Sequence, residues 1–164
     1  MLAMKCIARS QIINEQSPAP LITKYEHLDI ERLEQFAQQL LDRLPSGCVI
    51  GLVGTLGAGK TRLVQAIAAK AGIDVAEVTS PTFTLLQTHT SERIVLHHLD
   101  AYRIHDEDEF IELGVEELFD DDSAWTIVEW ADLVSGSMPK QTIWIEIELE
   151  PENDWRTITV KTTR

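Results

Sequence analysis

Basic residues are scarce in this chain, with 14 lysines and arginines against 27 aspartates and glutamates, which gives a formal net charge of −13. Proteins that capture duplex DNA or an RNA backbone draw much of their affinity from lysine and arginine contacts to phosphate. The shortage therefore speaks against strong, direct nucleic-acid binding. It favours a basic protein as the partner.

Cysteines and long apolar runs are also scarce. Cys6 and Cys48 are the only cysteines among 164 residues, so we expect no disulfide framework. The opening residues lack the apolar run of a signal peptide. No stretch reaches the roughly eighteen apolar residues that a membrane span needs. These absences predict a cytoplasmic protein in a reducing compartment.

The length fits one domain with a sizeable core. Residues 1–26 contain the polar, proline-bearing stretch NEQSPAP and are expected to form a loosely ordered N-terminal segment. Four apolar residues in it could still add an edge strand: Ile12, Ile13, Leu21 and Ile22. Residues 27–164 are expected to form a single domain.

Helical and strand-like patterns alternate along that domain. Apolar residues spaced by three and four predict helices at 29–44, 60–72 and, broken at Gly114, 106–121. Apolar or alternating runs predict strands at 48–53, 83–90, 93–100, 125–130, 142–149 and 155–162. Strand–loop–helix units with several further strands predict an α/β fold with a mixed β-sheet and helices on both faces.

One short motif carries a specific chemistry. Gly54, Gly59, Lys60 and Thr61 satisfy the Walker A pattern G-x-x-x-x-G-K-[ST], between an expected strand and an expected helix. Its glycines let backbone N–H groups face phosphate oxygens, and the helix directs the positive end of its dipole to the same place. The lysine can reach the β and γ phosphates, and the threonine can offer its hydroxyl to Mg²⁺.

The motif predicts a P-loop NTPase fold that binds a nucleoside triphosphate with Mg²⁺. ATP is favoured over GTP because the only near match to a guanine-reading element, TKYE at 23–26, precedes the Walker A motif and ends in Glu. The cofactors are therefore expected to be ATP and Mg²⁺. Contacts to the nucleotide are expected from Thr55, Leu56, Gly57, Ala58, Gly59, Lys60, Thr61 and Arg62.

Two acidic residues close apolar runs and could complete such a site. Asp100 ends IVLHHLD and Glu129 ends the run in WTIVEW, so both are expected at carboxyl ends of strands, where ligands bind in α/β sheets. Either could hold the magnesium shell with Thr61, and Glu129 could orient or deprotonate the attacking water. Each could instead be a solvated strand end, but two beside a Walker A motif favour a functional site.

The stretch TSPTFT at 79–84 is placed like a switch loop, in which Thr82 or Ser80 could sense the γ-phosphate and Mg²⁺. An ordinary connecting loop is an equal alternative. Trp130 adjoins Glu129 at a strand end. His97 and His98 are neighbours on an expected strand, so their side chains should point to opposite faces, and we expect structural roles for both.

Five short stretches, GTLGAGKT, SPTFTL, HLDAYR, GVEELF and IVEW, occur in an order and spacing that resembles the TsaE (YjeE) family over residues 28–159. The family consists of small bacterial P-loop ATPases needed to make threonylcarbamoyladenosine in tRNA. The Walker A motif is common to many families, whereas SPTF followed by HLDxYR and EW is far more specific. The family usually has an acid where this chain has Thr55.

The resemblance implies a function and roles for individual residues. Lys60 and Thr61 would bind phosphate and Mg²⁺, and the loop holding Thr82 would act as a switch. Asp100 would be the Walker B-type acid, and Glu129 with Trp130 would be needed for activity. The protein would be an Mg²⁺-dependent ATPase, weak alone, that docks on the TsaB–TsaD pair and resets it between turnovers.

Two other functions stay open on the residues alone. A small P-loop kinase would need a basic lid over the phosphates, but residues 104–155 contain no arginine and one lysine, Lys140. A nucleotide-gated binding module with negligible hydrolysis would need no base at Glu129. Arg103 is a candidate arginine finger or a salt-bridging residue.

Overall fold

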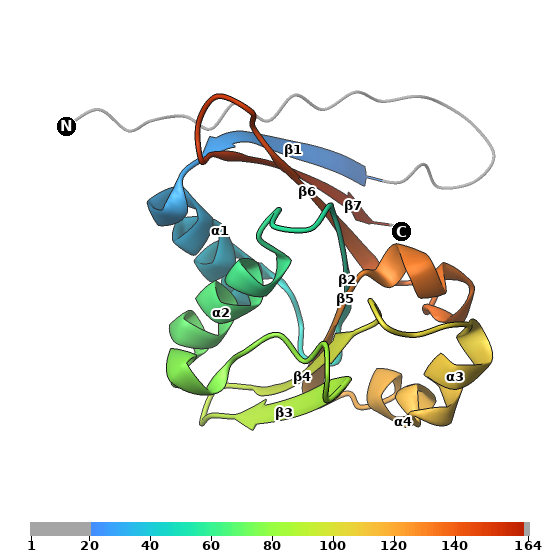
Figure 1. Ribbon diagram of the computed structural model, residues 1–164. Helices are drawn as coiled ribbons and strands as arrows, with labels where there is room; N and C mark the ends of the chain where they lie inside the picture. Colours follow the sequence, from blue (N-terminus) through green and yellow to red (C-terminus); the bar gives the residue numbers. More distant parts are fainter. Residues whose placement is uncertain (1–20, 163–164) are drawn as a thin grey trace.

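The computed structural model describes residues 21–162 (Figure 1). Its centre is a seven-stranded mixed sheet with the strand order β1-β7-β6-β2-β5-β4-β3. Strands β4, β5, β2 and β6 run parallel, and antiparallel pairs extend the sheet at both edges. The strands are β1 (Leu21–Leu28), β2 (Val49–Val53), β3 (Leu86–Thr90), β4 (Val95–Asp100), β5 (Ala124–Glu129), β6 (Ile143–Leu149) and β7 (Arg156–Thr162).

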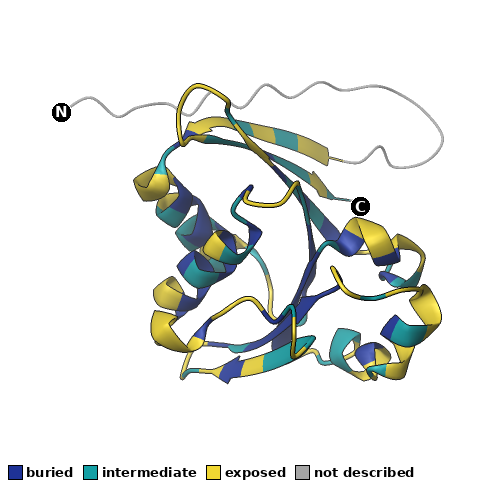
Figure 2. Ribbon diagram, viewed as in Figure 1, coloured by how far each residue is buried: buried dark blue, intermediate teal, exposed yellow. Residues whose placement is uncertain are grey.

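Helices cover both faces of this sheet, as Figures 1 and 2 show. On one face α1 (Ile30–Arg43) and α2 (Lys60–Ala71) pack together and bury the larger apolar cluster. On the other face α3 (Glu107–Glu112), α4 (Val115–Phe119) and the 3₁₀ segment η2 (Ala131–Ser137) bury the second. A short 3₁₀ turn, η1 (Val75–Glu77), follows α2.

The central strand β2 shows why this sequence forms a layered α/β fold. Ile50 and Leu52 face the α1–α2 cluster and are fully buried, while Val49 belongs to the cluster on the other face. Successive side chains of a strand point to opposite faces, so a run that is apolar throughout is suited to burial on both sides. The expected P-loop NTPase fold with a mixed sheet and helices on both faces is confirmed.

The helix that precedes β2 begins where its sequence indicates. The Asp29 carboxylate accepts a hydrogen bond from the backbone N–H of Arg32 at 2.8 Å, which satisfies one free donor of the first turn of α1. Its Leu33, Phe36 and Leu40 recur at spacings of three and four and are buried. The apolar face of α1 therefore fixes the helix on the sheet.

The hairpin β3–β4 starts later than expected. We predicted a strand from Phe83, but residues 83–85 form a turn in which Leu85 has φ 66° and donates its N–H to the carbonyl of Pro81 at 2.6 Å. This turn bends the chain before β3 begins at Leu86. The expectation of strand structure from residue 83 was wrong because the turn competes with extension there.

At the opposite edge of the sheet, Leu21 and Ile22 lie in β1, which pairs antiparallel with β7. This strand crosses position 26, where the sequence placed a boundary, while Ile12 and Ile13 lie outside the described residues. The division into a segment 1–26 and a domain 27–164 stays a prediction. Within residues 21–162 no helix is both long and apolar enough to cross a bilayer.

Candidate functional site

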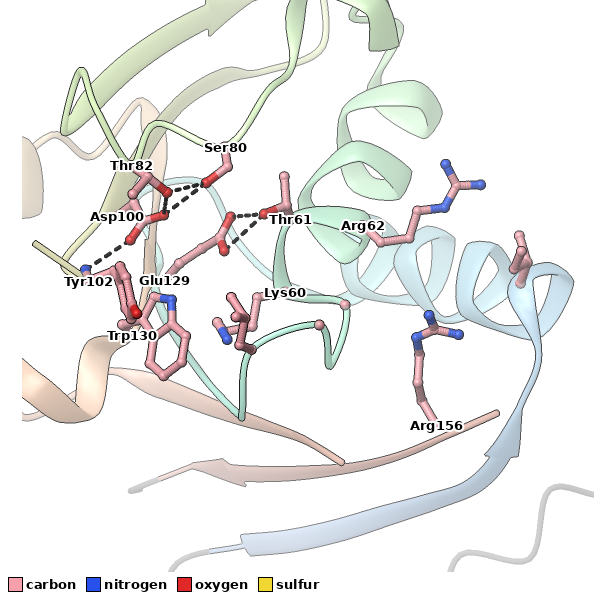
Figure 3. Close-up of a pocket in the computed structure, with 14 residues that line it drawn as sticks. Lys60, Thr61, Arg62, Ser80, Thr82, Asp100, Tyr102, Glu129, Trp130 and Arg156 are labelled. Carbon is pink, nitrogen blue, oxygen red and sulfur yellow. Dashed lines mark hydrogen bonds between the residues drawn. The ribbon is translucent and has the colours of Figure 1, made fainter. Parts of the chain in front are cut away.

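The carboxyl ends of β2, β4 and β5 and the beginning of α2 surround a pocket of about 550 Å³ (Figure 3). Eleven residues that the sequence singled out line it: Leu56, Gly57, Gly59, Lys60, Thr61, Arg62, Ser80, Thr82, Asp100, Glu129 and Trp130. Its lining also includes Ile30, Tyr102 and Arg156. The volume suits a small-molecule ligand.

The loop between β2 and α2 depends on glycine at two places. Gly54 has φ 156°, and a Cβ atom there would collide with the carbonyl oxygen of Ile147. Gly59 precedes α2 with φ 107°, and its Cβ would lie 2.7 Å from Nε of Arg156. Only a residue without a side chain fits both the backbone angles and the space, as the Walker A pattern requires.

Thr55 and Ala58 belong to this loop but do not line the pocket. The carbonyl of Thr55 accepts from Lys60 Nζ at 3.0 Å. Ala58 is fully buried, and its carbonyl accepts from Arg156 Nε at 3.2 Å. Both therefore shape the loop through their backbone, and their predicted contact with the nucleotide stays a prediction.

Lys60 is enclosed by the loop and by an aromatic ring. Its Nζ donates to the carbonyl of Gly54 at 2.7 Å and lies 3.6 Å from the ring centre of Trp130. Burial lowers the pKa of Lys60, and the nearby negative charges, of Glu129 first, oppose this effect. A phosphate group would offer the ammonium a charged acceptor in place of neutral carbonyls, which is a stronger interaction.

Glu129 faces the first turn of α2. Thr61 Oγ1 lies 2.8 and 3.0 Å from the two carboxylate oxygens of Glu129, as Figure 3 shows. The contact follows from strand order, because β5 is the direct parallel neighbour of β2. Glu129 is only 2% exposed, and one of its carboxylate oxygens also lies 2.8 Å from Nε2 of His98.

Asp100 holds the TSPTFT loop. One of its carboxylate oxygens accepts from Ser80 Oγ at 2.9 Å and from Thr82 Oγ1 at 2.7 Å. The other accepts from the backbone N–H of Tyr102 at 2.9 Å. Asp100 is 2% exposed and lies on β4, one strand farther from β2 than Glu129. The loop that resembles a switch is thus joined to a buried acid of the pocket.

Trp130 closes one side of the pocket with a strained backbone. It has φ 57°, a left-handed conformation that bulky residues avoid, and its ring lies 4.9 Å from that of Tyr102. Such backbone strain costs about 1–3 kcal/mol and persists where the surroundings enforce it, often at functional sites. Here it directs the ring toward Lys60.

The acids and the hydroxyl suit Mg²⁺ that arrives with a nucleotide. Asp100, Glu129 and Thr61 supply hard oxygen atoms on one side of the pocket. Among the described residues no group of three or more His, Cys, Asp or Glu side chains could hold a metal by itself. Mg²⁺ commonly binds through one or two carboxylates together with substrate phosphates, so this donor set fits it.

Sequence reasoning missed the part that Arg156 and His98 play in this site. Arg156 stands on β7, almost a hundred residues after the Walker A motif, and reaches the loop because β7 is the second strand from β2 in the sheet. His98 was expected to be structural. Its alternation with His97 indicated opposite faces, but only the register of β4 against β5 shows that it meets Glu129.

Comparison with known proteins decides the family. The model of the family described as "Threonylcarbamoyl adenosine biosynthesis protein TsaE" matches residues 27–158. This chain belongs to the TsaE family. A Treponema pallidum protein named for tRNA threonylcarbamoyladenosine biosynthesis is 36% identical over 117 residues, 71% of this chain and 84% of that protein. A Bacillus subtilis protein of the same name is 34% identical, covering 76% and 77%.

A solved structure supports the same relationship. The crystal structure of Bacillus subtilis YdiB superposes with a TM-score of 0.72 at 28% sequence identity, covering 88% of each chain. The resemblance noted from short motifs over residues 28–159 is thereby confirmed. The chain has a P-loop nucleotide-binding fold, as its Walker A motif predicts.

Proposed function

We propose that this chain is an Mg²⁺-dependent ATPase that serves threonylcarbamoyladenosine modification of tRNA by acting on the TsaB–TsaD complex. Weak hydrolysis alone and faster hydrolysis with the partners are expected. The names of its relatives supply the pathway. The cysteine content favours the cytoplasm as its compartment.

One observation carries the catalytic part of the proposal. Two buried carboxylates line one pocket, and each accepts a hydrogen bond from a different segment of it. Glu129 accepts from Thr61 of the Walker A motif, and Asp100 accepts from Thr82 of the TSPTFT loop. In P-loop enzymes, an acid near the Walker A hydroxyl supports the metal, and a loop beside the γ-phosphate changes with the state of the nucleotide. This arrangement supports hydrolysis coupled to a conformational signal.

The residues then divide the work. We assign Lys60 to the β and γ phosphates, with the backbone N–H groups of the loop around it. Glu129 holds the Thr61 hydroxyl and stands where it can also orient a water. Asp100 holds the loop through Ser80 and Thr82. Bound Mg²⁺ would supply positive charge that offsets the charge developing on the phosphate oxygens.

A protein partner suits the charge of the chain better than tRNA does. The net charge of −13 disfavours direct capture of a polyanion. Phe83, in the loop that Asp100 holds, is 84% exposed, and Leu56 of the Walker A loop is 80% exposed. Exposed apolar side chains on both loops of the nucleotide pocket would let a protein surface sense the nucleotide.

Reconstitution tests this function. Phosphate release is measured for the chain alone and with purified TsaB and TsaD from the same organism, and binding to the pair is measured with ATP, with ADP and without nucleotide. We expect stimulated hydrolysis and tighter binding with ATP than with ADP. Modification is then measured by mass spectrometry of tRNA nucleosides from depleted cells that carry the wild-type chain or its Lys60→Ala variant.

The two alternatives predict different outcomes of the same experiment. Transfer of the γ-phosphate to a small acceptor, with no stimulation by TsaB and TsaD, would identify a kinase. ATP-dependent binding to the pair without any phosphate release would identify a nucleotide-gated binding module. Equal affinity of the pair for the ATP and ADP forms would contradict a switch role for the TSPTFT loop.

A further inference from the structure

His98 lies behind Glu129, on the interior side of the nucleotide pocket. Its side chain is completely buried, and its Nε2 atom lies 2.8 Å from Oε1 of Glu129. An ionised carboxylate has only acceptors, so the ring nitrogen must donate in this contact. The contact therefore selects the imidazole form that carries a proton on Nε2.

The strand register explains why these two side chains meet. His98 of β4 pairs with Ile127 of β5, and Glu129 follows two residues later on the same face of the sheet. Diagonal neighbours of this kind are within reach of long and aromatic side chains. His97 points to the opposite face, where it contacts Thr88 and Asp121.

The surroundings of Nδ1, the other ring nitrogen of His98, are polar as well. Within residues 21–162, three buried side-chain nitrogen or oxygen atoms have no hydrogen-bond partner: Nδ1 of His98, Oε1 of Gln87 and Nε2 of His89. Gln87 lies directly opposite His98 across the hairpin, and His89 follows it on the same face. Burial lowers the pKa of His89, which favours its neutral form. Buried polar atoms left in this way are commonly joined by an internal water.

We propose that His98 is a positioning residue for Glu129, with Nε2–H fixing the carboxylate toward Thr61 and a buried water joining Nδ1 to Gln87 and His89. The proposal rests on the function proposed above for Glu129. A glutamate side chain has three rotatable bonds, and the Thr61 hydroxyl that also holds it lies in the nucleotide pocket. The contact from the interior does not depend on the pocket being filled.

Kinetics of three variants test the positioning role. His98→Leu removes the donor, and His98→Gln can place an amide N–H near the position of Nε2. His97→Leu is the matched control, because it removes the neighbouring buried histidine from the opposite face. With His98→Leu we expect kcat of partner-stimulated hydrolysis to fall about 10- to 100-fold, the range typical of lost supporting contacts, while ATP affinity stays within about threefold.

His98→Gln should recover a substantial part of that loss, and His97→Leu should keep the wild-type kcat. The positioning role is overturned if His98→Leu hydrolyses ATP at the wild-type rate, or if His98→Gln is no better than His98→Leu.

The second test needs neither nucleotide nor partner. In protein labelled with ¹⁵N-histidine, nitrogen NMR should show a proton on Nε2 of His98, and Glu129→Leu should remove this preference. A predominant Nδ1–H form in the wild-type chain would overturn the proposal. If His98 carries the proton on Nε2 but the chain never hydrolyses ATP, the proposed function is refuted and the His98–Glu129 contact is still supported. A high-resolution crystal structure that shows no water next to Nδ1 of His98 would overturn the proposed buried water.

Discussion

Thr61 and Glu129 are joined at two points, with the threonine hydroxyl 2.8 and 3.0 Å from the two carboxylate oxygens. They lie 68 positions apart in the sequence, and adjacent parallel strands bring them together. Asp100, which the sequence resemblance marks as the Walker B-type acid, accepts hydrogen bonds from Ser80 and Thr82 of the TSPTFT loop. The two acids therefore contact different segments of the pocket, and substituting each should have a different effect.

Glu129→Gln should slow partner-stimulated hydrolysis by roughly 10²-fold or more, because the amide keeps the size but loses the charge and the basicity. Since Thr61 loses its charged acceptor, the Mg²⁺ concentration needed for half-maximal ATP binding should rise. ATP affinity at saturating Mg²⁺ should stay within a few-fold. Phosphate release and calorimetric titration measure the three quantities. Glu148→Gln, an exposed change on β6, is the control, and normal hydrolysis by Glu129→Gln would place the base elsewhere.

Asp100→Asn should weaken the hydrogen bonds that hold the TSPTFT loop to the pocket. Hydrogen bonds to a charged acceptor contribute about 1.5–3 kcal/mol, more than those to a neutral amide, and Ser80 and Thr82 both donate to this carboxylate. We expect the preference of the TsaB–TsaD pair for the ATP form over the ADP form to shrink. Surface-based binding in each nucleotide measures it, with the exposed Asp120→Asn as control. An unchanged preference would show that Asp100 does not transmit the signal.

Lys60→Ala should lower ATP affinity roughly tenfold or more, since a charge-assisted contact to phosphate contributes about 1.5–3 kcal/mol. Lys70→Ala is the matched control. It removes the same side chain near the other end of α2, where Lys70 lies 3.5 Å from Glu34 on the surface. Titration calorimetry with ATP and Mg²⁺ compares the two variants. Equal affinities for both would refute the role of Lys60.

Cys48 should resist alkylation in the folded protein. Burial raises the pKa of its thiol to about 12, so at pH 8 roughly one thiol in ten thousand is the reactive thiolate. A Cys6→Ser background leaves Cys48 as the one cysteine of the chain. Its labelling by iodoacetamide, followed by mass spectrometry, should be slow in buffer and fast in denaturant. Rapid labelling under native conditions would contradict the buried position.

Much of the fold and the site could be predicted because the informative residues are close in sequence. The glycines, Lys60 and Thr61 lie within eight positions, and the apolar runs before Asp100 and Glu129 indicate strands whose ends meet at one edge of a parallel sheet. Which strand lies next to β2 is not encoded locally, since parallel strands are joined by crossovers. The sequence therefore could not show that Glu129 rather than Asp100 meets Thr61.

Arg156 and His98 were out of reach for related reasons. Arg156 approaches the Walker A loop only through the order of β2, β6 and β7 in the sheet. His98 contacts Glu129 only because of the register between β4 and β5. Neither fact changes the composition or the periodicity of the segment in which the residue stands.

The left-handed backbone of Trp130 has a consequence for how this strand end can vary. In a regular strand two successive side chains point to opposite faces, yet Glu129 contacts Thr61 while Trp130 covers Lys60. The adjacent residues Glu129 and Trp130 thus contact the adjacent residues Thr61 and Lys60. Inserting a single residue between Glu129 and Trp130 would turn one of these two side chains away from its contact, so the chain length at the end of β5 is fixed.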